Sequence, residues 1–220
     1  MAWPAGAAAS PGDPVRAGGT TVQTVEGLPP FKATIEPLTA AEREAMTPSV
    51  WRKGCPVGLR DLRAVRAKHV GFDGRAHDGI LVVHRARAAS VRNVLRGLYA
   101  AGFPIRRMHP IQRYGGDDST SIDDDNTSAF NCRAVTGGTG WSEHAYGRAI
   151  DLNPIENPYV TGAGSTEHAA SKPVLDRSDV RPGMATEGSL VVRAFGSRGW
   201  KWGGRWTAPI DHQHFSTTGR

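Results

Sequence analysis

Near its middle the chain reads Ser142-Glu143-His144-Ala145-Tyr146-Gly147-Arg148-Ala149-Ile150-Asp151, and near its C-terminus Asp211-His212-Gln213-His214. These stretches offer imidazole and carboxylate groups, which Zn²⁺ takes as ligands together with an open position for water. His144 and Asp151 come from one stretch and His214 from the other, distant one. We therefore predict a hydrolytic zinc site held by His144, Asp151 and His214.

The segment leading to Asp151 has the pattern of a turn followed by a strand. Gly147 allows the chain to reverse, and residues 148–152 alternate in side-chain character. In a strand, Ile150 and Leu152 would point to one face and Asp151 to the other. Two apolar anchors would then hold the carboxylate rigidly in a cleft.

The C-terminal motif leaves two assignments open. Asp211 would serve as the general base, which takes a proton from water and passes it to a leaving amine. In an ideal strand, however, His212 and His214 share a face, which makes them an alternative ligand pair. Asp211 and His214 would then point apart, so the first assignment requires a local twist or bulge at Gln213.

The chemistry of such a site involves further groups. A bound zinc ion would lower the pKa of its water from about 15.7 towards 7. Arg133, or another cation, would stabilise the oxyanion of a tetrahedral intermediate. The remaining histidines lack comparable neighbours in the sequence, and we expect them to be structural or exposed: His69, His77, His84, His109 and His168.

Size and composition predict one compact domain. A chain of 220 residues has room for a single core that buries roughly 70% of the unfolded surface. Residues 1–29 are rich in Ala, Gly and Pro, so we expect a flexible leader there and a domain at 30–220. The leader lacks the pattern of a signal peptide, and no apolar run approaches the roughly 20 residues of a membrane span. We therefore expect a soluble protein. Separately, we expect a monomer, although nothing in the sequence bears on the oligomeric state.

Basic residues are in excess and unevenly distributed. Lys and Arg outnumber Asp and Glu by 27 to 21, which gives a net charge of +6. Residues 51–107 hold 13 basic residues against three acidic ones. Such a surface would attract a polyanion, either nucleic acid or an anionic bacterial wall; an ordinary solvated surface is the alternative. An acidic run among Ser and Thr is expected to form an exposed loop: Asp117, Asp118, Asp123, Asp124 and Asp125.

The chain contains two cysteines, Cys55 and Cys132. They do not form a Cys-x-x-Cys pair, which argues against a zinc-thiolate or redox motif. We favour a disulfide between them, which would be worth roughly 4 kcal/mol in the chain-entropy model. Two buried free thiols are the alternative.

Side-chain periodicity predicts a mixed fold. Alternating or apolar runs predict strands at 62–70, 80–83, 104–108, 148–152 and 212–216. Helical spacing predicts helices at 86–101 and 187–198. The polar segments 110–128 and 153–183 are expected to lie on the surface as loops. This order favours an α+β fold, with a small antiparallel sheet and flanking helices.

The first motif also resembles a known family. Ser142-x-His144-x-x-Gly147-x-Ala149-x-Asp151 matches, at every fixed position, the signature of the D-Ala-D-Ala carboxypeptidase and L-Ala-D-Glu endopeptidase family of zinc peptidases. Asp211-x-x-His214, followed by Phe215, is similar to the second motif of that family. The similarity extends from about Trp51 to Ser216, and includes Gly54-Cys55-Pro56, Gly71-Phe72-Asp73-Gly74 and Trp200-x-Trp202-Gly203-Gly204.

The resemblance implies a small α+β fold of the Hedgehog type. It implies a zinc ion held by His144, Asp151 and His214, with an acidic base at Asp211. It also implies that the substrate is the stem peptide of bacterial peptidoglycan. A protein with this substrate would be secreted or associated with the cell wall, or would be a phage-type endolysin.

Two further residues and one departure follow from the same resemblance. Arg133 and Ser142 fall where the family places groups that contact the substrate or the developing oxyanion. Many members carry Glu where this chain has Asp211, and Asp occurs chiefly among the endopeptidases. The resemblance therefore favours cleavage between L-Ala and D-Glu, with D-Ala-D-Ala carboxypeptidase activity as the alternative.

Two other functions compete with a peptidase. A metal-dependent nuclease of the ββα type would use Asp211-His212 and hold phosphates with the basic surface. That design needs a further helix after the histidine, whereas eight residues follow His212 here, so we expect no nucleic-acid partner. A catalytically silent relative that only binds the wall is the other competitor. The intact Asp211 and Arg133 favour activity.

Overall fold

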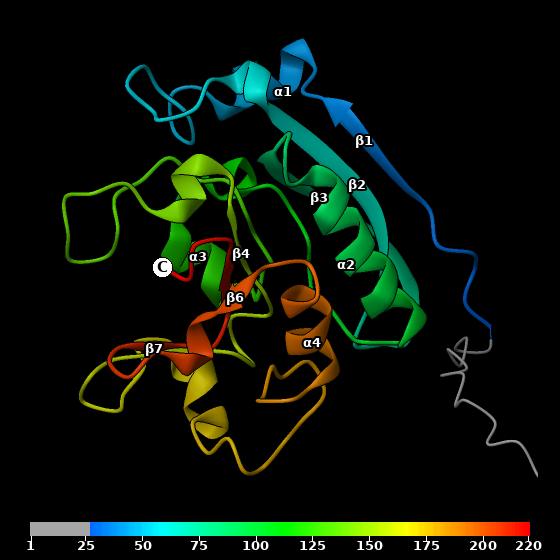
Figure 1. Cartoon of the computed structure of the whole chain (residues 1–220), viewed down its shortest axis with the longest axis vertical. Coiled ribbons are helices and arrows are strands. Elements are labelled where there is room, and N and C mark those ends of the chain that lie inside the picture. The colour runs from blue at the N-terminus through cyan, green and yellow to red at the C-terminus, as the bar shows by residue number, and fades with distance from the viewer. Residues whose placement is uncertain (1–26) are drawn as a thin grey trace, which may run out of the picture.

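The computed structural model describes residues 27–220, so most of the expected leader at 1–29 lies outside the described residues. The strands and larger helices are β1 (Ala33–Pro37), α1 (Ala40–Met46), β2 (Leu62–Val70), β3 (Ala76–His84), α2 (Ala88–Ala100), α3 (Asp118–Asp123), β4 (Ala149–Asp151), β5 (Tyr159–Val160), α4 (Leu190–Gly196), β6 (Lys201–Trp202), β7 (Ile210–Asp211) and β8 (His214–Ser216). Short 3₁₀ helices occur at Leu59–Asp61 (η1), Ile111–Tyr114 (η2), Glu143–Tyr146 (η3), Ala169–Val174 (η4) and Gly203–Arg205 (η5). Helices and small antiparallel sheets together give the predicted α+β class (Figure 1). Within the described range, no helix has the length and apolar character needed to cross a membrane.

The N-terminal sheet has the order β1-β2-β3, with antiparallel pairing throughout. Successive side chains of β2 point to opposite faces, and both faces are buried. Val65 and Ala67 join the core beneath α2, whereas Leu62 and Ala64 pack with Met46 of α1 in a second core. The predicted strand at 62–70 matches β2, because a strand covered on both faces combines small and apolar residues.

Helix α2 lies against the N-terminal sheet, and α4 packs against α2 (Figure 1). The apolar side of α2 was predicted from helical spacing and is buried. The helix ends before Gly102, whose φ of +65° suits a helix terminus. Helix α4 is shorter than the predicted 187–198, because Ser189 caps its first turn by accepting a hydrogen bond from the N–H of Val192.

The C-terminal half contributes a second antiparallel sheet, β4-β8-β6, with β8 in the centre. Ile150, Leu152 and Phe215 from this sheet are buried in the main core. The predicted anchoring of the segment around Asp151 by two apolar side chains is therefore confirmed. Strand β5 lies within residues 153–183, which were expected to be a surface loop, and it pairs with β7.

The prediction of a strand at 104–108 was wrong. This segment forms isolated bridges at Val70–Pro104 and Arg107–Asn126. Between them, the N–H of Arg106 donates to the side-chain oxygen of Asn153, over 3.2 Å. A side-chain amide takes the place of a neighbouring strand here, which sequence periodicity does not reveal.

The acidic run at 117–125 is not simply an exposed loop. It contains helix α3, which Asp117 caps by accepting a hydrogen bond from the N–H of Thr120, over 2.7 Å. Asp118 lies in the first turn, where the helix dipole favours a negative charge. The acidic residues therefore begin a helix instead of preventing one.

Cys55 and Cys132 form the disulfide that the sequence favoured, and it closes 77 residues of chain. Part of the basic excess at 51–107 is neutralised by ion pairs with acids from other segments: Arg66 with Glu36 and Glu42, Arg106 with Asp125, and Arg107 with Asp124. The excess counted along the sequence therefore overstates the charge of the folded surface.

His69 is a buried histidine of β2, 4% exposed, and it is paired across the sheet with His77. Neither ring nitrogen of His69 has a hydrogen-bond partner among residues 27–220. Burial, followed by the neighbouring His77 and His109, lowers the pKa of His69 to about 4. The folded protein therefore keeps this ring neutral at pH values where an unfolded chain would protonate it.

We predict that His69→Leu makes the protein less sensitive to acid. Because the folded pKa of about 4 lies below the unfolded value of 6.5, His69 removes stability as the pH falls between these values. The full effect is on the order of 3 kcal/mol. Thermal unfolding at about pH 7.5 and about pH 4.5 should show a smaller drop in Tm for the variant. An equal drop in both proteins would contradict the assignment.

Candidate metal centre

The segment from Ser142 to Gly147 carries the first candidate ligand. Ser142 caps η3 by accepting a hydrogen bond from the N–H of His144, over 3.3 Å. Gly147 ends η3 with a φ of +64°, and a Cβ there would lie 2.5 Å from the main-chain nitrogen of His84. The position therefore needs glycine for both conformation and space. The predicted reversal occurs there and leads directly into β4.

Antiparallel pairing of β4 with β8 places Asp151 opposite His214. The Nε2 of His144 lies 3.1 Å from Oδ2 of Asp151 and 3.3 Å from Nδ1 of His214. The Nδ1 of His214 lies 3.1 Å from Oδ1 of Asp151. Tetrahedral ligands at zinc bond lengths are separated by about 3.3 Å. The three buried side chains thus have the donor set and spacing that fit zinc.

The other nitrogen of each imidazole is held by a main-chain oxygen. Nδ1–H of His144 donates to the carbonyl of Ala129, and Nε2–H of His214 donates to a main-chain oxygen of Arg220, over 3.1 Å. These bonds leave the lone pairs of His144 Nε2 and His214 Nδ1 directed at the space between the two rings and the Asp151 carboxylate, where a metal ion would bind. Outer hydrogen bonds of this kind orient histidine ligands in metal sites.

The charges of His144, Asp151, Asp211 and His214 favour a positive charge in the space between the two imidazole rings. Despite burial, which acts the other way, His144 and His214 hold the pKa of Asp151 well below its usual range. Burial also lowers the pKa of His214, but Asp151 and Asp211 outweigh it and raise the value to about 9. The carboxylates therefore stabilise a cation between the rings, whether a proton or a metal ion carries the charge.

The structure contains the break near Gln213 that our assignment of Asp211 required. Asp211 ends β7, which pairs with β5, whereas His214 begins β8, which pairs with β4. Because the strand is interrupted at residues 212–213, Asp211 and His214 can line the same cavity. Burial, and then the charge of Asp151, raise the pKa of Asp211 to about 7. Its Oδ1 has no hydrogen-bond partner in the described part of the chain.

His212 does not share this environment. Its ring lies 5.8 Å from the ring of Trp202, measured between centroids, and its carbonyl accepts a hydrogen bond from Nε1 of Trp202, over 2.7 Å. It is not among the residues that line the cavity. The structure therefore does not support the alternative ligand pair of His212 and His214.

The candidate ligands open into a cavity of about 410 Å³. Both Arg133 and Ser142 line it, and Arg133 forms an ion pair with Asp118 of α3. Several wall residues were not predicted, because they come from distant segments: Glu143, Tyr159, Thr166, Trp206 and Arg220. Glu143 could have been found from its place beside His144, whereas the others carry no motif.

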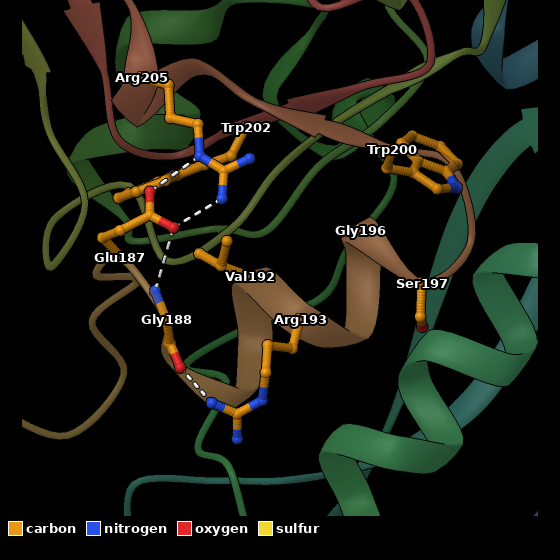
Figure 2. Close-up of a pocket in the computed structure, with 9 residues that line it drawn as sticks. All are labelled: Glu187, Gly188, Val192, Arg193, Gly196, Ser197, Trp200, Trp202 and Arg205. Carbon is orange, nitrogen blue, oxygen red and sulfur yellow. Dashed lines mark hydrogen bonds and ion pairs between the residues drawn. The ribbon is translucent and has the colours of Figure 1, made fainter.

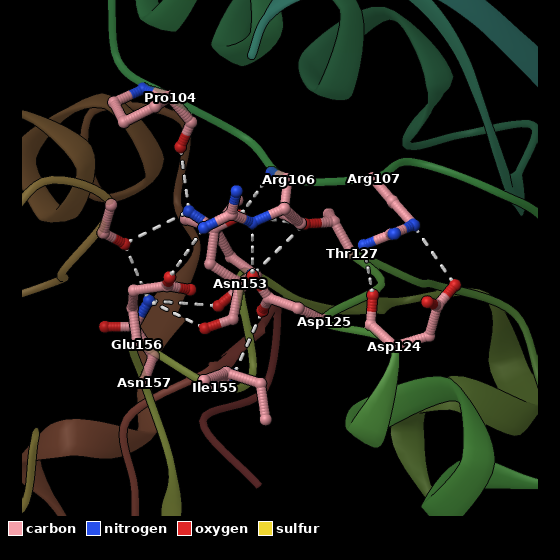
Figure 3. A network of polar contacts seen from close by, with 12 residues as sticks. Pro104, Arg106, Arg107, Asp124, Asp125, Thr127, Asn153, Ile155, Glu156 and Asn157 are labelled. Atoms are coloured by element: carbon pink, nitrogen blue, oxygen red, sulfur yellow. Dashed lines mark hydrogen bonds and ion pairs between the residues drawn. The ribbon is translucent and has the colours of Figure 1, made fainter. Parts of the chain in front are cut away.

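Asn153 follows Asp151 by two residues and ties β4 to neighbouring segments (Figure 3). Its Oδ1 accepts from the N–H of Arg106, and its Nδ2 donates to the carbonyls of Pro104, over 2.8 Å, and Gly183, over 3.1 Å. Its φ of +41° is one that Asn adopts more readily than most residues. These bonds fix the backbone that carries the candidate ligand.

Glu156 belongs to the same network (Figure 3). Arg106 lies 3.7 Å from Oε1 of Glu156 and 3.4 Å from Oδ2 of Asp125. Burial of Glu156, and then the charge of Asp125, outweigh Arg106 and raise the pKa of Glu156 to about 8. The folded protein therefore retains a proton on Glu156 at neutral pH, where an unfolded chain would release it.

We predict that Glu156→Gln makes the protein more resistant to alkaline pH. Because the folded pKa of about 8 exceeds the unfolded value of 4.5, Glu156 removes stability as the pH rises between these values. Gln keeps the shape without the charge, so its Tm should fall less between about pH 5 and about pH 9. Differential scanning calorimetry measures this, with the exposed Glu44→Gln as a control. Parallel curves for Glu156→Gln and wild type would refute the assignment.

A second hollow, of about 380 Å³, lies between α4 and η5 (Figure 2). Glu187 and Arg205 form two hydrogen bonds across it, of 2.6 and 2.8 Å. Trp200 and Trp202 are only 3% and 6% exposed, so their rings offer little surface to a ligand. The hollow contains none of the predicted site residues, and its polar groups satisfy one another.

Comparison with known proteins agrees with the motifs. Residues 136–217 match the family described as D-alanyl-D-alanine carboxypeptidase, which belongs to the zinc peptidase M15 superfamily. Over these residues, the chain is similar to that family. The matched region includes His144, Asp151, Asp211 and His214, and begins just after Arg133. No curated protein and no solved structure gave a significant match.

The family match supports a peptidase related to peptidoglycan. We predict that the purified protein binds about one zinc ion per chain, and that His144→Ala or His214→Ala abolishes this binding. His212→Ala should keep the metal, because His212 faces Trp202. Elemental analysis by mass spectrometry after dialysis measures the zinc. Loss of zinc from the His212 variant, with retention in the His214 variant, would show that the ligand assignment is wrong.

Proposed function

We propose that this protein is a zinc-dependent peptidase that cleaves peptidoglycan stem peptides between L-Ala and D-Glu, with residues 30–220 as its catalytic domain. The observation that carries the proposal is the arrangement of Asp211 beside a buried group of two imidazoles and a carboxylate. A structural histidine cluster would not need an unpartnered carboxylate oxygen in the same cavity. The family match over residues 136–217 supports the same chemistry.

In the proposed mechanism, His144, Asp151 and His214 hold the zinc ion. When bound, the ion supplies Lewis acidity, which makes water a stronger acid and polarises a peptide carbonyl. Asp211 accepts a proton at its free Oδ1 and returns it to the leaving amine. Its burial suits this role, because a carboxylate of raised proton affinity is a better base near neutral pH.

Arg133 and Ser142 are proposed to contact the substrate. Both line the cavity, on opposite strands of a small hairpin, where the N–H of Ser142 donates to the carbonyl of Arg133 over 3.1 Å. The disulfide at Cys132 anchors this hairpin next to Arg133. The guanidinium of Arg133 would stabilise negative charge on the carbonyl oxygen of the scissile peptide bond as the tetrahedral intermediate forms.

The choice of bond rests on Asp211. The family resemblance associates Asp at this position chiefly with endopeptidases, which favours the bond between L-Ala and D-Glu. The D-Ala-D-Ala bond is the second candidate, because the matching family is described by that carboxypeptidase activity. Both imply action on peptidoglycan at or outside the cell surface, by a secreted, wall-associated or phage-type enzyme. We propose that the enzyme acts as a monomer.

We predict that Asp211→Ala keeps zinc but lowers kcat by a factor of about 10²–10⁴, the usual contribution of a general base. Asp211→Asn should behave alike, because it preserves shape without proton affinity. Release of soluble fragments from purified peptidoglycan measures turnover, and elemental analysis measures zinc. Full activity in either variant would show that the base lies elsewhere.

The bond itself can be identified from the products. We expect mass spectrometry of digested peptidoglycan to show fragments with new N-terminal D-Glu. Release of free D-Ala would instead indicate the carboxypeptidase. Wild-type protein that binds zinc but releases neither product would favour the silent wall-binding relative. Cleavage of DNA by the purified protein, lost in His212→Ala, would favour the nuclease.

A further inference from the structure

We infer that Arg220 binds a free α-carboxylate of the substrate, on the residue that follows the scissile bond. This inference rests on the proposed peptidase function and adds a determinant of specificity to it. Arg220 lies beyond the region that matches the family, which ends at residue 217. It nevertheless lines the cavity that contains His144, Asp151 and His214.

The chain after β8 is held in place at successive residues. The N–H of Thr217 donates to the carbonyl of Arg148 (3.1 Å), and the N–H of Gly219 donates to Oγ of Ser216 (3.0 Å). Two side chains bind the carbonyls that follow: Nζ of Lys201 donates to Thr218 (3.2 Å), and Nε1 of Trp206 donates to Gly219 (3.0 Å). The C-terminus consequently lies near α3, whose residues form another wall of the cavity (Figure 1). The position of Arg220 is therefore built into the fold.

Arg220 is also tied to the metal centre itself. Its main-chain oxygen accepts the hydrogen bond from Nε2–H of His214, over 3.1 Å. Since Nδ1 of His214 faces Asp151, the backbone of Arg220 lies one imidazole ring away from the proposed metal position. A guanidinium on that backbone can reach groups of a substrate close to the scissile bond.

The charges on the cavity wall indicate what Arg220 would bind. Two arginines line the cavity: Arg133, which is paired with Asp118 and which we assign to the carbonyl oxygen of the scissile bond, and Arg220. Arg220 is exposed and forms no ion pair within residues 27–220. Glu143 and Glu167 also line the cavity and carry negative charge. An anionic substrate group would therefore be directed to Arg220, which can bind a carboxylate through two parallel hydrogen bonds.

Both candidate bonds present the same chemical group to this position. In a stem peptide, D-Glu continues the chain through its side-chain carboxyl, so its α-carboxylate stays free next to the L-Ala–D-Glu bond. In a D-Ala-D-Ala terminus, the last residue also carries a free α-carboxylate next to the bond. In each case the group lies on the leaving-amine side. Arg220 would therefore select for a D-residue with a free α-carboxylate after the cleaved bond.

The test uses the zinc-loaded full chain and two pairs of synthetic peptides. One pair contains the L-Ala-γ-D-Glu linkage, with the α-carboxyl of D-Glu free or amidated. The other pair ends in D-Ala-D-Ala, with the terminal carboxyl free or amidated. The pair that is cleaved, and whose rate depends on amidation, identifies the source of the carboxylate. The variants are Arg220→Met and Arg220→Lys, and Arg198→Met is the control because Arg198 is exposed and lies outside the cavity.

We expect wild type and Arg198→Met to prefer the free carboxylate by about tenfold or more in kcat/KM, as a charge-assisted contact provides. Arg220→Met should reduce this ratio towards one, mainly through a higher KM for the peptide with the free carboxylate. Arg220→Lys should keep part of the preference. Zinc content should not change, because the main-chain oxygen that orients His214 remains in every variant.

A ratio that is the same in wild type and Arg220→Met would overturn the inference. The proposed function could fail separately, with no cleavage of any peptide by the wild type. In that case calorimetric titration with the uncleaved peptides still decides: binding of the free-carboxylate peptide about tenfold weaker in Arg220→Met supports the carboxylate site. Equal binding in both proteins refutes it.

Discussion

The pairing of β4 with β8 is the constraint on which the rest of the site depends. Its register sets Asp151 opposite His214, with one carboxylate oxygen 3.1 Å from the imidazole nitrogen. The opposite faces of the same strands carry Ile150 and Phe215 into the main core. Because successive side chains alternate between faces, burial of the apolar residues determines that the polar ones face the cavity. A shift of one residue in register would reverse both faces.

Surrounding segments then remove the remaining freedom of the candidate ligands. Main-chain oxygens of Ala129 and Arg220 orient the two imidazoles, and the side chain of Asn153 fixes the backbone after Asp151. Glycine at 203 lets η5 pack behind the site, since a Cβ there would lie 2.6 Å from the carbonyl oxygen of Asp211. A site held in this way can keep carboxylates and imidazoles close together despite the unfavourable burial of charge.

Local patterns predicted the elements whose environment is regular. The strand at 62–70 and the helix near 86–101 were found because β2 and α2 bury faces with constant periodicity. The strand expected at 104–108 failed because Asn153 supplies hydrogen bonds that a second strand would otherwise supply. The acidic run concealed α3 because the same aspartates that suit a loop also suit a helix N-terminus.

By itself, the sequence determined which side chains could form the site. The spacing around Gly147, the separate C-terminal motif and their resemblance to a zinc peptidase family pointed to the group His144, Asp151 and His214, because imidazole and carboxylate are ligands that zinc takes. Only the tertiary structure shows that Asp211 lines the cavity with His214 and that His212 does not, since the interruption at residues 212–213 depends on two different pairing partners. The same holds for Tyr159, Trp206 and Arg220, which reach the cavity through contacts between segments far apart in the chain. A sequence records neighbours along the chain, whereas a cavity wall is made of neighbours in space.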